Sequence, residues 1–164
     1  MYRRILLAYD GSVEGRAALR EGAMLALCCK AQVFLLSVAG GVGVQLAESA
    51  HAGVLDEQQA QLRAIFEEGV EKLKRLGFAP VARLVAGDPA EEIRAFASEV
   101  GADLVVVGHR RRSLLERWWA GPSGAYLSDR LDCSLLVSRN TISDEVFEAA
   151  VDRFRSGVEP ASVA

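Results

Sequence analysis

Five short apolar runs, separated by stretches with helical spacing, organise the sequence. Continuous apolar runs of this length are typical of strands that are buried on both faces of a parallel sheet. We therefore predict strands at residues 5–8, 32–38, 81–85, 103–108 and 133–138. The third run contains Arg83, and a charged residue within a strand favours a place at or near an edge of the sheet.

Helix signals lie between the predicted strands. Ser12 and Asp88 stand at N-cap positions, and Pro89 fits the first turn of the helix that follows Asp88. Apolar positions at helical spacing predict further helices at residues 55–76, 122–131 and 143–155. Strands that alternate with helices predict a Rossmann-like α/β fold with a five-stranded, mainly parallel, doubly wound sheet. Ligands of such sheets bind beyond the carboxyl ends of the strands, where the strand order reverses.

The predicted elements divide into two parts at residue 140. Residues 1–140 hold all five strands and form one α/β domain, whereas residues 141–164 form a C-terminal helix and a loose tail. The helix carries its apolar residues on one side. The sequence leaves open whether this helix packs on its own domain or caps a dimer.

Composition narrows the class of protein. A net charge of −3 over 164 residues argues against a nucleic-acid-binding face. No stretch approaches the roughly 20 apolar residues that span a bilayer, and the N-terminus is too short for a signal peptide. Three cysteines without zinc-binding spacing predict buried, unpaired thiols in a reducing compartment. We therefore expect a cytoplasmic protein that binds neither a membrane nor a nucleic acid.

Three segments resemble the universal stress protein family when taken in order. The first is Ile5-Leu6-Leu7-Ala8-Tyr9-Asp10-Gly11-Ser12; the second is Gly87-Asp88-Pro89-Ala90-Glu91-Glu92-Ile93, followed by Gly101-Ala102-Asp103-Leu104-Val105-Val106-Val107-Gly108; the third is Cys133-Ser134-Leu135-Leu136-Val137. The resemblance covers about residues 1–139 and implies the strand order 3-2-1-4-5. It also implies a homodimer formed through the last strand, from Cys133 to Ser138, and, in many members, a site for ATP.

The nucleotide motif of the family is present here in altered form. Members that bind ATP carry Gly, two residues, Gly, nine residues, and then Gly followed by Ser or Thr. Gly108 and Gly121 match the first and third glycines, but Arg111 replaces the second and Pro122 replaces the hydroxyl residue. Arg111 adds a long side chain where the phosphates would lie, and Pro122 removes an amide and a hydroxyl from the anion site. Ser123 still offers an amide.

The resemblance places two further residues near the ligand. Asp10 matches the aspartate near the ribose and adenine, and Val38 matches a residue whose backbone meets the base. The candidate nucleotide-binding residues are therefore Asp10, Val38, Gly108, Arg111, Gly121 and Ser123, with ATP and Mg²⁺ as the possible ligand and no certain cofactor. An alternative role for Asp10 is to cap the helix that follows it.

The arginine-rich segment after Gly108 has more than one interpretation. Arg110, Arg111, Arg112 and Arg117 could hold phosphates, lie in solvent, or pair with acidic groups across a dimer. Trp118 and Trp119 are more typical of side chains that cover an apolar surface than of a base-stacking platform.

Two classes of function follow from these residues. The first is a non-enzymatic, homodimeric sensing or interaction module with a degenerate adenine-nucleotide site. Its variant is a true ATP-binding protein in which the arginine-rich loop holds the phosphates. The second class is a slow nucleotide hydrolase, for which Asp10 is the only carboxylate that the motif places in the crevice. The sequence predicts no catalytic residue and no metal ligand.

Overall fold

A single parallel sheet forms the centre of the molecule, in a computed structural model that describes residues 1–40, 52–109, 127–139 and 142–156. Its five strands lie in the order β3-β2-β1-β4-β5, which confirms the predicted sheet and its order. The strands are β1 (Arg4–Ala8), β2 (Gln32–Gly40), β3 (Val81–Gly87), β4 (Leu104–Gly108) and β5 (Ser134–Ser138). β3 lies at one edge, as Arg83 predicted.

Strand β1 occupies the middle of the sheet and marks the point where the strand order reverses. Ile5 is in register with Val33 of β2 on one side and with Leu104 of β4 on the other. The chain builds β2 and β3 on the first side and then returns to build β4 and β5 on the second. The carboxyl ends of β1 and β4 are therefore the two neighbouring strand ends between which a ligand crevice is expected.

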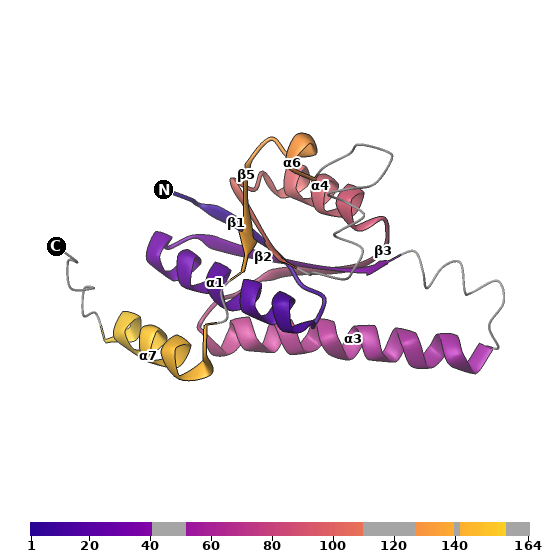
Figure 1. Cartoon of the computed structure of the whole chain (residues 1–164), viewed down its shortest axis with the longest axis horizontal. Helices are drawn as coiled ribbons and strands as arrows, with labels where there is room; N and C mark the ends of the chain where they lie inside the picture. Colours follow the sequence, from indigo (N-terminus) through magenta and orange to yellow (C-terminus); the bar gives the residue numbers. More distant parts are fainter. Residues whose placement is uncertain (41–51, 110–126, 140–141, 157–164) are drawn as a thin grey trace.

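Helices cover both faces of the sheet (Figure 1). On one face, α1 (Val13–Cys29) and α3 (Ala52–Arg75) pack on a core that contains Ile5 and Leu7 of β1. On the other face, α4 (Pro89–Val100) and α6 (Leu127–Arg130) pack on a core that contains Leu6. Because alternate residues of β1 serve opposite cores, Ile5, Leu6 and Leu7 all have to be apolar.

Most predicted boundaries hold, and the differences are local. Ser12 and Asp88 are the N-caps of α1 and α4. Strands β2 and β3 are each two residues longer than predicted, because their pairing continues to Gly40 and Gly87 and a backbone ladder needs no side chains. Of the helix predicted at residues 122–131, only α6 lies within the described residues.

The C-terminal helix α7 (Asp144–Arg155) packs on its own domain. It lies alongside α1, near the C-terminal end of α3 (Figure 1). The Arg20 guanidinium donates to the Ile142 carbonyl at 2.9 Å, Phe147 packs against the core beneath α1, and Val151 is only 5% exposed. Of the two placements left open by the sequence, the structure therefore shows the intramolecular one.

The cysteines are unpaired, but the prediction that all three are buried was wrong. Cys28 is exposed, and Cys29 and Cys133 are half-buried. Only one stripe of an amphipathic helix faces the core, and Cys28 falls outside that stripe at the end of α1. Partial burial raises the pKa of the Cys28 and Cys133 thiols, which favours the protonated form.

Candidate functional site: the crevice at the ends of β1 and β4

The turn after β1 is held by a chain of hydrogen bonds. The Ser12 amide and hydroxyl both donate to Oδ1 of Asp10, and the Ser12 hydroxyl accepts from the Gly15 amide at 2.9 Å. Ser12 is therefore the N-cap of α1, and Asp10 fixes the conformation of that cap. The capping role considered for Asp10 is thus indirect. Asp10 is an exposed residue just beyond the carboxyl end of β1.

Glycines permit two close approaches around this turn. Gly11 has a φ of +70°, and a Cβ on it would lie 2.6 Å from Cγ2 of Ile65 in α3. A Cβ on Gly15 would lie 2.3 Å from Oδ1 of Asp10. A side chain at Gly11 would clash with Ile65 and strain the backbone, so glycine allows the turn to lie directly against α3. A side chain at Gly15 would displace the Asp10 carboxylate from its place beside Ser12.

Gly108, at the end of β4, packs against the first turn of α1. A Cβ at this position would lie 2.6 Å from the carbonyl carbon and oxygen of Glu14 and 2.8 Å from the amide nitrogen of Gly15. The glycine that the motif assigns to phosphate binding therefore also has a packing role. Sequence reasoning missed this role, because no local pattern shows which helix will lie over a strand end.

Backbone and hydroxyl hydrogen bonds join β2 to the residue that follows β1. The Tyr9 amide donates to the Leu36 carbonyl at 2.9 Å, and the buried Ser37 hydroxyl donates to the Tyr9 carbonyl at 2.7 Å. Val38 is the next residue of β2 after Ser37, and it is in register with Val85 of β3. The structure thus places Asp10, Val38 and Gly108 at the same end of the sheet, where the strands have their carboxyl ends.

The structure does not describe the other candidate residues. Arg111, Gly121 and Ser123 lie outside the described residues, as do Pro122 and the Trp118–Trp119 pair.

A charged network between α1 and α3 was not predicted from the sequence. The Arg16 guanidinium in α1 donates two hydrogen bonds to the Glu68 carboxylate in α3, at 3.1 and 3.0 Å, and Lys72 Nζ donates to the same carboxylate at 2.6 Å. These hydrogen bonds, that of Arg16 first, lower the pKa of Glu68 to about 2. Burial, followed by the charge of Glu68, raises the pKa of the adjacent Tyr9 phenol to about 12. The network fastens the first turns of α1 to α3.

The Glu68 network predicts a stability difference that depends on pH. The folded-state pKa of Glu68 lies below its ordinary value of 4.5, so its contribution is present above pH 4.5 and is lost as the pH falls towards 2. Because Glu68 is 32% exposed, solvent screening reduces the contribution, and Glu68→Gln is expected to cost about 1 kcal/mol at pH 7. Urea denaturation at several pH values measures the difference between wild type and variant.

A matched control is available on the same helix. Glu71 pairs with Lys74, but both side chains are more than half exposed, so Glu71→Gln should leave stability nearly unchanged. A constant difference between Glu68→Gln and wild type from pH 7 down to pH 2 would contradict the role assigned to Glu68.

The described residues offer neither a metal site nor a membrane span. Among residues 1–40, 52–109, 127–139 and 142–156, no three His, Cys, Asp or Glu side chains gather closely enough to hold a metal ion. Over the same residues, no helix combines the length and apolarity needed to cross a bilayer.

Comparison with known proteins agrees with this architecture. The sequence model of the universal stress protein family matches residues 1–139, which include all five strands and the candidate crevice. The chain belongs to the universal stress protein family. The matched region ends at residue 139, before α7 begins.

Individual universal stress proteins cover nearly the same region. Universal stress protein YxiE of Bacillus subtilis is 29% identical over 150 residues, which is 85% of this chain and all of the relative. Two solved structures share the fold. A universal stress protein in complex with cAMP is 23% identical, with a TM-score of 0.63 and coverage of 85% of this chain and 99% of its own. The universal stress protein of Archaeoglobus fulgidus in complex with dAMP is 20% identical, with a TM-score of 0.62 and coverage of 84% and 98%.

Proposed function

We propose that this universal stress protein binds an adenine nucleotide between the loops that follow β1 and β4, and that it acts as a cytoplasmic, non-enzymatic sensing or interaction module. The observation that carries the proposal is the meeting of Asp10, Val38 and Gly108 at the strand ends where the sheet order reverses. Support also comes from proteins of the same fold that are in complex with cAMP and dAMP.

The altered motif favours a nucleotide with one phosphate over ATP. Arg111 supplies a guanidinium that can pair with a single phosphate, but its length takes up the space that a glycine would leave for a phosphate chain. Pro122 removes one amide from the end of that chain, while the amide of Ser123 is retained. In this proposal, Asp10 contacts the ribose, the backbone of Val38 meets the base, and Gly108 and Gly121 border the phosphate.

The β5 edge is the proposed contact between two copies of the chain. β5 has β4 on one side only, so its second edge carries backbone groups that another strand can pair with. Its central residues Leu135, Leu136 and Val137 are half-buried in one copy. Pairing through β5 would give a homodimer. The proposed nucleotide site of each copy, at the carboxyl ends of β1 and β4, would lie outside this contact.

Calorimetric titration tests the nucleotide site. AMP and cAMP are expected to bind more tightly than ATP with Mg²⁺, and Asp10→Ala should weaken AMP binding by about tenfold through loss of a charged hydrogen bond. The double variant Arg111→Gly with Pro122→Ser should tighten ATP binding by about tenfold, since it restores close backbone approach and an amide.

Two controls make the titration decisive. Arg112→Gly removes a neighbouring positive charge outside the motif positions and should not reproduce the gain in ATP binding. Absence of heat with AMP, cAMP and ATP up to about 1 mM, with folded and nucleotide-free protein, would contradict the proposal. Phosphate release from ATP that disappears in Asp10→Ala would instead identify the chain as a hydrolase.

A further inference from the structure

The proposed nucleotide site extends across neighbouring strand ends. In that arrangement the phosphate lies beside Gly108 of β4, the ribose beside Asp10 after β1, and the base beside Val38 of β2. These three strands are neighbours in the sheet, about 4.8 Å apart, and β3 is the next strand along. One edge of the base is attached to the ribose, so its opposite edge points on towards β3. The side chains at the carboxyl end of β3 therefore meet that edge.

A carboxylate lies over the carboxyl end of β3. Gly87 is the last residue of β3, and only Asp88 separates it from α4 (Figure 1). A Cβ on Gly87 would lie 2.7 Å from Oε1 and 3.0 Å from Cγ of Glu92, in the first turn of α4. Gly87 is in register with Gly40 of β2, two residues beyond Val38, and Val38 packs in the core cluster beneath α4. The Glu92 carboxylate and Val38 therefore lie on the same face of the sheet, one strand apart.

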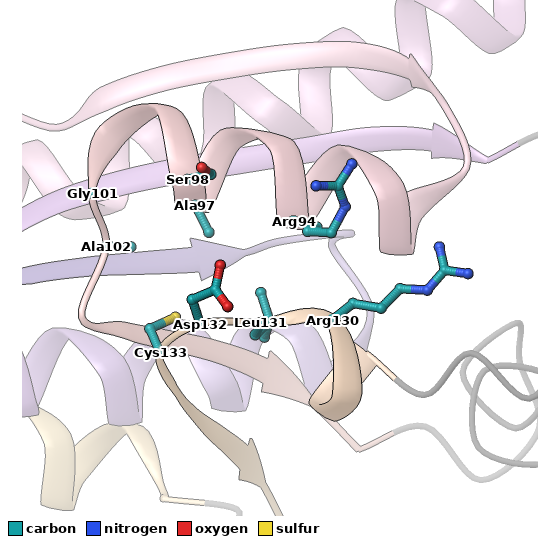
Figure 2. Close-up of a pocket in the computed structure, with 9 residues that line it drawn as sticks. All are labelled: Arg94, Ala97, Ser98, Gly101, Ala102, Arg130, Leu131, Asp132 and Cys133. Atoms are coloured by element: carbon teal, nitrogen blue, oxygen red, sulfur yellow. The ribbon is translucent and has the colours of Figure 1, made fainter.

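Glu92 differs from the other acidic residues of α4 in its lack of a basic partner. Glu91 pairs with Arg94 and Arg130, which both line the recess shown in Figure 2. Glu99 accepts two hydrogen bonds from an arginine of β3. Within the part of the chain that the structure describes, the half-buried Glu92 carboxylate has no ion pair and no hydrogen bond. Partial burial removes water from this carboxylate, so a donor supplied by a ligand would stabilise it.

We propose that Glu92 selects adenine by accepting a hydrogen bond from the exocyclic amine of the base, an inference that rests on the proposed nucleotide site. Adenine carries this amine on the edge opposite the ribose, and an ionised carboxylate accepts hydrogen bonds but donates none. A carboxylate recognises the exocyclic amine of cytosine in DNA in the same way. Hypoxanthine carries a carbonyl oxygen in place of the amine, so two acceptors would face each other.

The charge of Glu92 is compatible with a phosphate in the same site. β3 and β4 are three strand spacings apart in the sheet, which is about 14 Å. At physiological ionic strength the Debye length is about 8 Å, so repulsion between the carboxylate and the phosphate is largely screened. Glu92 therefore acts on the choice of base and leaves the phosphate to the other end of the site.

Calorimetric titration of the full chain with AMP and with inosine monophosphate (IMP), whose base is hypoxanthine, tests the inference. The wild type is expected to bind AMP about tenfold more tightly than IMP. Glu92→Gln should weaken AMP binding about threefold and tighten IMP binding about threefold, because a glutamine amide can donate to the carbonyl oxygen of hypoxanthine. The two affinities would then agree within about twofold. Glu91→Gln is the matched control, since it removes the neighbouring charge on α4 and should keep the wild-type ratio of affinities.

The outcomes separate this inference from the proposed function. Equal binding of AMP and IMP by the wild type, or an unchanged ratio in Glu92→Gln, would overturn the role of Glu92 while the nucleotide site itself stood. A loss of discrimination in Glu91→Gln as large as in Glu92→Gln would also overturn it, because the effect would then belong to the charge of α4 in general. A folded chain that binds neither nucleotide at about 1 mM would overturn the nucleotide site and this inference together.

Discussion

Gly108→Ala is expected to destabilise the domain by about 3 kcal/mol, through overpacking against a backbone that cannot rotate away. The added Cβ would lie 2.6 Å from the carbonyl group of Glu14, inside the first turn of α1. The φ angle of Gly108 is not positive, so the cost arises from packing and not from backbone conformation. Chemical denaturation measures the loss. Nucleotide binding should weaken as well, because the clash displaces the helix that carries Ser12 and supports Asp10.

Gly87→Ala is the matched control for that substitution. Gly87 also ends a strand, but a Cβ there would meet the carboxylate of Glu92 at 2.7 Å, which is the free end of a flexible side chain. Its expected cost is below about 0.5 kcal/mol, since surface changes of this kind are usually small. If Gly108→Ala kept wild-type stability and lost only nucleotide binding, the packing role would be wrong and Gly108 would serve the ligand alone.

The packing of Gly108 affects how the degenerate motif is interpreted. A glycine at this position is required by the contact with Glu14 whether or not a phosphate binds nearby. The identity of residue 108 as glycine therefore does not by itself support nucleotide binding, which rests on the position of this strand end beside Asp10 and Val38. Arg111 and Pro122 are the two departures from the ATP-binding motif, so the double variant that tests ATP binding alters those two positions.

Val151→Ala is expected to cost about 2 kcal/mol, the second-largest effect predicted here, because it removes buried methyl groups from the contact of α7 with the domain. Val151 is 5% exposed, whereas Val146 on the same helix is 59% exposed. Val146→Ala therefore provides a control with the same change of side chain and an expected cost below about 0.5 kcal/mol. Thermal or urea denaturation measures both. Equal losses in the two variants would contradict the docking of α7.

Truncation after Arg139 extends this prediction to the domain boundary. The two core clusters are formed chiefly by residues of β1 to β5, α1, α3 and α4, and Phe147 of α7 packs only on the margin of one of them. We therefore expect the shortened chain to fold with reduced stability, and circular dichroism at increasing temperature measures the reduction. A truncated chain without cooperative unfolding would mean that residues 1–140 do not form a domain by themselves.

Local patterns determined the elements of this protein. The apolar run around Leu6 predicts a strand that is buried on both sides, because a polar residue there would face one of two cores. Ser12 and Asp88 mark helix starts, because their oxygens accept from amides two or three residues ahead. Such signals span a few residues and need no knowledge of the rest of the chain. The order of the strands came from resemblance to a family, since spacing alone does not fix it.

Only the tertiary structure decided which distant groups meet. Glu68 and Arg16 are 52 residues apart, and nothing near either residue in the sequence indicates their pairing. Burial of Val151, exposure of Cys28 and the contact of Gly108 with Glu14 likewise depend on which helix lies over which surface. A sequence pattern reports the preferences of a chain within one or two helical turns. Packing instead selects among long-range arrangements, because each close contact depends on the positions of all the elements around it.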